Sequence, residues 1–190
     1  MDTAAIYNHF TEIIDKLWDN EEYREYLEYP DYDETHYCDN ITLASGVTRL
    51  AIIDDNYDWI VKIDIEDNYC DWEEELYNRA RYKGIEDMFA ACFFIGRYMD
   101  WNLYAYEKAD CSYHAYDIAD EDRYSGSPLS ARNPSIAADM LKMWGQEKFD
   151  LLTNFCIDNR ISDLHCGNVG YICGKLVLTD YAGYGSCSSR

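Results

Sequence analysis

The sequence predicts an α+β fold in which helices pack on a five-stranded antiparallel sheet. Three observations support this class. The 190 residues are 48% hydrophobic and 16% aromatic, enough for the core of one domain or of two small lobes. Short β-branched runs separated by turns occupy much of residues 41–109. Segments with apolar residues at helical spacing precede, interrupt and follow these runs.

The first 40 residues predict an acidic helical extension. Residues 3–29 have a helical apolar repeat, with Asp2 or Thr3 available as the cap. The acidic, tyrosine-rich tract that follows is broken by Pro30 and is expected to be a solvated helix end and loop. The apolar residues of the repeat are Ile6, Phe10, Ile13, Ile14 and Leu17.

Residues 41–109 predict the sheet and one helix. The helix begins at Asp71, ends before Gly84 and turns Leu76, Tyr77 and Ala80 inward. Three runs before it read as an antiparallel meander, and two runs after it complete the sheet. The five expected strands span residues 41–46, 48–54, 59–65, 91–99 and 101–109.

Residues 110–190 begin with a polar stretch and predict a small helical region. Pro134 opens a long helix that runs to about Asn159. A polar loop, an apolar strand and a second polar loop then fill residues 161–183. The helix residues expected to face inward are Ile136, Met140, Trp144, Leu151, Leu152 and Phe155.

The net charge of −21 restricts the possible partners. Acidic residues outnumber basic ones by 12 to 2 in residues 1–40 and by 19 to 8 in residues 41–130, whereas residues 131–190 carry 6 of each. Such a surface repels nucleic acid and anionic membranes. It attracts basic proteins and can imitate a phosphate backbone.

The eight cysteines form no C-x-x-C motif, and several lie in apolar runs where a thiol acts as a small hydrophobic group. No apolar run approaches the ~18 residues of a membrane span, and no signal-like segment opens the chain. We therefore expect a cytoplasmic protein with free thiols.

Three short motifs together resemble the protein-kinase-like superfamily. "DLHCGN" (163–168) is similar to the D-L-H-x-G-N catalytic loop of antibiotic kinases, "LVLTDYAG" (176–183) to the metal-binding motif that follows it, and "WIVKID" (59–64) to the third-strand lysine motif. The chain looks closest to aminoglycoside and choline phosphotransferases and to small phage-encoded kinases. The resemblance implies a bilobal fold, with an antiparallel amino-terminal lobe at 41–109 and a minimal carboxy-terminal lobe at 110–190.

Phosphoryl transfer asks for positioning and charge neutralisation, which these residue types supply. Asp163 is the candidate base for the acceptor hydroxyl. Asn168 and Asp180 offer the oxygen ligands that Mg²⁺ prefers, and Lys62 would hold the α- and β-phosphates of ATP. Among the consecutive residues 73, 74 and 75, Glu73 is the expected partner of Lys62 because it shares a helix face with the inward side.

Two further residues complete the candidate site, and two alternatives stay open. Gly46 is the single glycine of the expected phosphate-covering segment, 44–49, which lacks a G-x-G-x-x-G pattern. His165 either bonds the backbone of its own loop or, as the resemblance implies, touches the γ-phosphate. Asp163 and His165 could instead open a metallophosphoesterase motif, although no histidine follows.

The acceptor is not identified by the sequence; a protein Ser/Thr hydroxyl and a small molecule both fit. Only seven residues follow the "YAG" of the metal motif, so a peptide-binding platform is expected to be missing. Ile161 and Ser162 replace the His-Arg that precedes the catalytic Asp in many kinases. The second hypothesis is accordingly a catalytically weak kinase-like fold that acts as an acidic inhibitor of phage type, binding a basic protein.

Overall fold

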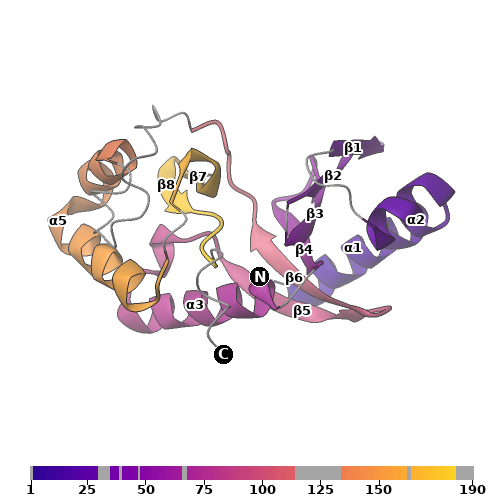
Figure 1. Ribbon diagram of the computed structural model, residues 1–190, viewed down its shortest axis with the longest axis horizontal. Coiled ribbons are helices and arrows are strands. Elements are labelled where there is room, and N and C mark those ends of the chain that lie inside the picture. The colour runs from indigo at the N-terminus through magenta and orange to yellow at the C-terminus, as the bar shows by residue number, and fades with distance from the viewer. Residues whose placement is uncertain are drawn as a thin grey trace. The chain divides into compact units, whose positions relative to one another are not determined.

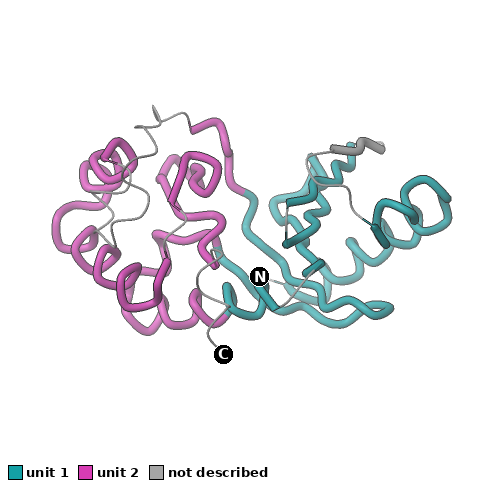
Figure 2. The backbone as a smooth tube through the Cα atoms, in the orientation of Figure 1, with its two compact units in different colours: residues 1–74, 91–108 teal, residues 75–90, 109–190 magenta. Residues whose placement is uncertain are grey.

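The computed structural model divides the chain into two compact units (Figure 2). Unit 1 comprises residues 1–74 and 91–108, and unit 2 comprises residues 75–90 and 109–190. Within them, the structure describes residues 2–29, 35–38 (backbone), 40–46, 48–65, 68–113, 134–161 and 164–182.

Unit 1 is built on a six-stranded antiparallel sheet with strand order β1-β2-β3-β4-β6-β5 (Figure 1). The five predicted strands are confirmed. The additional edge strand, β1, lies at the end of the acidic tract that was expected to be a loop, and its pairing with β2 is a contact that the composition of that tract does not reveal. The strands are β1 (Thr35–Cys38), β2 (Ile41–Ser45), β3 (Arg49–Asp54), β4 (Trp59–Asp64), β5 (Cys92–Tyr98) and β6 (Trp101–Glu107).

The first segment forms two helices, α1 (Thr3–Trp18) and α2 (Glu21–Glu28), so the prediction of one helix over 3–29 was wrong. Asp2 caps α1 by accepting hydrogen bonds from two backbone N–H groups. Asn20 caps α2 by accepting one from Glu22, which starts a new helix instead of continuing the first.

The two faces of the sheet differ in their cover. The side chains of one face pack against the apolar sides of α1 and α2 in a single core. Along β3 and β4, the side chains that alternate with many of these point to the opposite face and are half-buried. The core residues of the sheet and the two helices are Ile6, Phe10, Ile13, Ile14, Leu17, Tyr26, Leu27, Leu43, Leu50, Ile52, Val61, Ile63, Leu103 and Ala105.

Helix α3 (Tyr69–Lys83) contributes residues 69–74 to unit 1 and residues 75–83 to unit 2. It starts two residues before Asp71, so the predicted cap was wrong. The backbone N–H of Cys70 bonds the Asp64 carboxylate instead, at 2.9 Å, and the Asp71 carboxylate accepts the hydroxyl of Tyr104. The predicted inward stripe of Leu76, Tyr77 and Ala80 is confirmed as buried.

Unit 2 contains a long helix and a β-hairpin. Helix α5 (Pro134–Asp158) is interrupted at Gly145, where φ is 78° and ψ is 165°, so the prediction of one continuous helix was wrong at this point. Leu151, expected to face inward, is 42% exposed. The remaining elements are η1 (Glu86–Met88), η3 (Cys166–Asn168), β7 (Val169–Ile172) and β8 (Lys175–Leu178), of which only β8 was predicted as a strand.

Aromatic packing holds the hairpin in unit 2. The Phe89 ring makes edge contacts with Phe155 and Tyr181, and the Tyr181 hydroxyl donates to the Ala90 carbonyl at 3.0 Å. Trp144 of α5 donates its indole N–H to the carbonyl of Leu176 in β8, at 2.9 Å. The ammonium groups of Lys148 and Lys175 lie 5.1 and 4.7 Å from the centre of that ring. None of the described helices is both long and apolar enough to cross a membrane.

Candidate functional site

The predicted Lys62–Glu73 pair is present in unit 1. The Lys62 ammonium, from the middle of β4, lies 4.0 Å from a Glu73 carboxylate oxygen, and Glu73 is 0% exposed. Its two neighbours have different surroundings: Glu74 accepts the backbone N–H of Phe94, and Glu75 pairs with Arg79 one turn along the helix. The structure thus separates three identical consecutive residues by their position around α3.

A second cation, which the sequence analysis missed, lies even closer to Glu73. A guanidinium nitrogen of Arg49 is 2.6 Å from the same carboxylate oxygen. Arg49 begins β3 and pairs with Asp64, while Ala51 pairs with Lys62, so both cations project from one face of the sheet. The alternation of the two predicted strands was the available signal, because residues 49 and 51 had to share a face.

Besides Glu73, the Lys62 side chain contacts an aromatic ring. Its ammonium lies 4.3 Å from the centre of the Tyr106 ring, a cation–π distance. Burial raises the pKa of the Tyr106 hydroxyl well above its ordinary value, and it does the same to the thiols of Cys70 and Cys92. These groups therefore stay protonated at neutral pH, and the two thiols act as small packing groups, which the apolar run around Cys92 predicted for that residue.

An apolar strip lies beside Lys62 on the same face of the sheet. Ala44 pairs with Ala51, which pairs with Lys62, and Ile53 pairs with Ile60 two residues along the strands, on the same face. These four apolar side chains are only half buried, whereas Leu50, Ile52 and Val61, which alternate with them, are in the core. Half-exposed apolar side chains next to two cations suit a ligand that has a flat apolar part and an anionic part.

Gly46 lies in the turn between β2 and β3, at the edge of this strip. Its backbone N–H bonds the Arg49 carbonyl at 2.9 Å, which closes the turn. A Cβ atom at Gly46 would meet nothing nearer than that carbonyl oxygen, at 3.9 Å. The turn itself therefore does not need a glycine, and any requirement would come from a ligand that approaches the backbone.

The hairpin in unit 2 brings together the two predicted metal ligands. Val169 pairs with Leu178, and the Asn168 carbonyl accepts the backbone N–H of Thr179 at 2.9 Å. Asn168 and Asp180 thus flank the same end of the hairpin, although twelve residues separate them in the sequence. Asn168 is buried and Asp180 half-buried. One amide and one carboxylate oxygen suit Mg²⁺, which keeps several waters and takes its other ligands from phosphate.

The last two predicted residues belong to the loop before the hairpin. The Nδ1 atom of His165 accepts the backbone N–H of Gly167 at 3.0 Å, the local contact that was one of its two expected roles. Asp163, the candidate base, lies outside the described residues. Among those that are described, no three His, Cys, Asp or Glu side chains gather as a metal cage.

The predicted residues divide between the two units. Gly46, Lys62 and Glu73 belong to unit 1, and the loop and hairpin residues belong to unit 2. The expected phosphate-contacting residues that the structure describes therefore lie in unit 1, and the expected metal ligands lie in unit 2.

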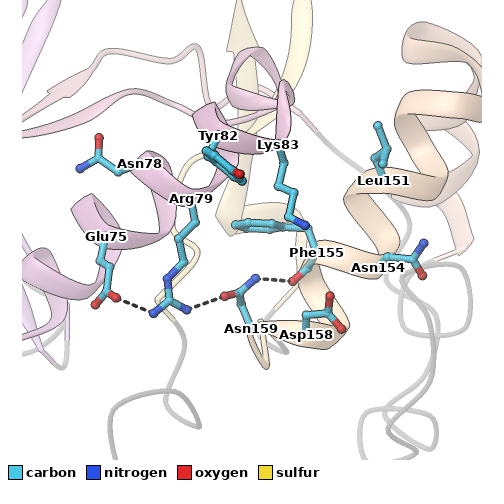
Figure 3. Close-up of a pocket in the computed structure, with 10 residues that line it drawn as sticks. All are labelled: Glu75, Asn78, Arg79, Tyr82, Lys83, Leu151, Asn154, Phe155, Asp158 and Asn159. Atoms are coloured by element: carbon cyan, nitrogen blue, oxygen red, sulfur yellow. Dashed lines mark hydrogen bonds and ion pairs between the residues drawn. The ribbon is translucent and has the colours of Figure 1, made fainter.

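A separate cavity of about 530 Å³ lies within unit 2, between α3 and α5 (Figure 3). Arg79 crosses it, paired with Glu75 and donating to the Asn159 side chain at 2.8 Å, while Asn159 donates to the Phe155 carbonyl. None of the predicted site residues within the described ranges lines it.

Comparison of the chain with models of known protein families, with curated proteins and with solved structures found no match in any of the three.

Proposed function

We propose that this protein is a kinase-like phosphotransferase that uses ATP and Mg²⁺ to phosphorylate a hydroxyl group. The observation that carries the proposal is the wholly buried Glu73 beside Lys62, 4.0 Å apart, between a helix and the middle of a strand. Burying a carboxylate is costly unless cations are held near it. A folded protein that maintains this arrangement beside a half-exposed apolar strip has the features of an anion site.

The surroundings of Lys62 support a nucleotide as the phosphate donor. The strip of Ala44, Ala51, Ile53 and Ile60 offers a flat apolar surface to the base, and the Lys62 ammonium offers charge to the phosphates. A lysine donates up to three hydrogen bonds and reaches phosphate as a compact point charge. The backbone at Gly46 leaves room for a close approach of phosphate oxygens.

The hairpin of unit 2 supports the metal assignment. Asn168 and Asp180 would hold Mg²⁺ through one amide and one carboxylate oxygen. The ion would neutralise the charge that develops on the transferring phosphoryl group. The hydrogen bond from the Thr179 N–H to the Asn168 carbonyl supports this assignment, because it keeps Asn168 and Asp180 at one end of the hairpin.

Asp163 is assigned the role of base from its position in the sequence motif. It would orient the acceptor hydroxyl and take its proton. The acceptor oxygen then forms a bond to the γ-phosphorus while the bond from that phosphorus to the β–γ bridging oxygen breaks, and ADP leaves with that electron pair. Products are a phosphate ester and ADP.

A binding and transfer experiment tests the proposal. Wild-type protein, Asp180→Asn and the control Asp150→Asn, an exposed carboxylate bonded to Gln146, would be melted with and without Mg·ATP and assayed for transfer from [γ-³²P]ATP to a lysate. We expect Mg·ATP to raise the melting temperature of the wild type. D180N should fold normally and lose transfer, whereas D150N should retain it.

The opposite results would count against the enzyme. A wild-type protein that Mg·ATP does not stabilise, or a D180N variant with full transfer activity, contradicts the proposal. If nucleotide has no effect and the protein instead captures a basic protein in a salt-sensitive manner, the acidic inhibitor becomes the better explanation of the −21 charge.

A further inference from the structure

The nearest cation to Glu73 is Arg49, at 2.6 Å, and not Lys62, at 4.0 Å. We propose that Arg49 is a positioning residue: it balances the charge of Glu73 so that Lys62 remains available to the phosphates of the nucleotide. This inference rests on the proposed function and adds to it a residue that no motif in the sequence identifies.

The position of Arg49 suits a permanent partner of Glu73. Its side chain is 10% exposed, and its guanidinium also lies 5.8 Å from the centre of the Tyr69 ring in α3. Arg49 is fixed in the sheet by its pairing with Asp64, whose carboxylate in turn bonds the first turn of α3. A guanidinium keeps its charge at every physiological pH and has a rigid set of donors, which suits a fixed structural pairing.

The position of Lys62 suits a partner that can leave. A separation of 4.0 Å is longer than any hydrogen bond, so Lys62 and Glu73 attract each other without being bonded. The ammonium is also held by the Tyr106 ring, at 4.3 Å. Lysine has a flexible stem, so a modest change of rotamer can carry its charge to an arriving phosphate.

The two distances together explain why a second cation is useful. When Lys62 turns to phosphate, a carboxylate with 0% exposure would lose a compensating charge in a dry environment. Arg49 keeps Glu73 balanced through that step. Without Arg49, Glu73 would hold Lys62 tightly, and nucleotide would have to compete with a buried ion pair for the same ammonium.

A suppressor experiment separates this role from direct phosphate contact. Binding of Mg·ADP would be measured by calorimetry for wild type, Arg49→Met, Glu73→Gln and the double variant. We expect R49M to weaken binding by about 10- to 100-fold, because Lys62 is then engaged by Glu73. Adding E73Q to R49M should restore binding to within about 3-fold of wild type, since the Glu73 carboxylate then no longer competes with nucleotide for Lys62.

Arg49→Lys is the second variant, for use if R49M does not fold by circular dichroism. It retains the charge, so binding should stay within about 3-fold of wild type, because a surviving cation still balances Glu73. For each variant that folds, the melting temperature without nucleotide is recorded, since a purely structural Arg49 would lower it and leave the affinity for Mg·ADP unchanged.

Each contrary outcome has a distinct meaning. If wild type does not bind Mg·ADP, the proposed function fails and the inference fails with it. If wild type binds but R49M binds equally well, only the inference is overturned. If R49M is weak and the double variant is equally weak, Arg49 touches phosphate itself and the positioning role is overturned. A weakened R49K overturns it too, because charge balance alone would then be insufficient.

Discussion

Three consecutive glutamates allow a matched test of how burial changes the contribution of a charged side chain to the free energy of unfolding. Glu73, Glu74 and Glu75 are each changed to Gln, which keeps shape and removes charge. Glu73 is 0% exposed, and its loss leaves Arg49 and Lys62, with side chains 10% and 12% exposed, without that carboxylate. Removing one partner of a buried ion pair costs about 3–5 kcal/mol, so E73Q should lower the free energy of unfolding by about 3 kcal/mol or more.

The other two variants are the controls. Glu75 is 43% exposed and pairs within its own helix, where such a pair contributes about 0.3–0.5 kcal/mol. A glutamine at position 74 can still accept the Phe94 N–H through its amide oxygen. Urea unfolding at pH 7 measures all three, with the midpoint and slope fitted separately. If E73Q lowers the free energy of unfolding no more than E75Q does, the buried Glu73 carboxylate does not stabilise the fold as its ion pairs with Arg49 and Lys62 indicate.

Three further predictions concern the rest of the fold. Burial alone would raise the pKa of Asp54, but hydrogen bonds from the Asn56 N–H and from His9 hold that pKa below its ordinary value. The ionised Asp54 therefore adds its full share to the free energy of unfolding above about pH 4. That share is lost as the pH falls through the pKa of Asp54 in the folded state. The difference in the free energy of unfolding between wild type and Asp54→Asn should therefore become smaller at low pH, as measured from unfolding curves at several pH values. A difference that does not change with pH would show that the lowered pKa of Asp54 does not stabilise the fold. Gly96→Ala should cost about 1–3 kcal/mol, because a Cβ would lie 2.8 Å from the Tyr7 ring at a φ of 148°, whereas Gly46→Ala should change stability by no more than about 0.5 kcal/mol. Equal unfolding midpoints for these two variants would show that the ring moves aside freely. Tyr181→Phe removes the hydroxyl that donates to the Ala90 carbonyl and should cost about 1–2 kcal/mol by chemical denaturation, with an unchanged free energy contradicting the bond.

The sequence predicted best where the pattern has a single physical explanation. Alternating β-branched runs produced five strands, and the face shared with Tyr77 and Ala80 placed Glu73 inward. Both predictions depend only on the repeat of the element that contains the residue. Local periodicity was therefore sufficient to choose Glu73 among the three glutamates, whereas its pairing with Lys62 was expected from the resemblance to the kinase-like motifs.

The sequence predicted less well where capping or pairing with a distant segment decides the outcome. Asn20 starts a second helix within an apolar repeat that continues across it, and Gly145 interrupts α5 through a left-handed conformation that its repeat does not reveal. Strand β1 is defined by its pairing with β2, and the acidic tract before it is typical of a loop although Thr35 and Tyr37 are themselves strand formers. Arg49 was missed because strand alternation placed it on one face with Ala51, but only the register of β3 against β4 brings that face to Lys62 and Glu73.

The tryptophans are unevenly distributed, and this gives the protein an internal optical probe. Four of the five, at positions 18, 59, 72 and 101, belong to unit 1, so Trp144 is the one that belongs to unit 2. Its indole is bonded to the Leu176 carbonyl and flanked by two ammonium groups, so its emission should change when α5 separates from β8. Subtracting the fluorescence of Trp144→Phe from that of wild type would isolate the signal of the hairpin unit. Its melting can then be followed against that of the sheet in one unlabelled sample, which would show whether the two units unfold as one cooperative system.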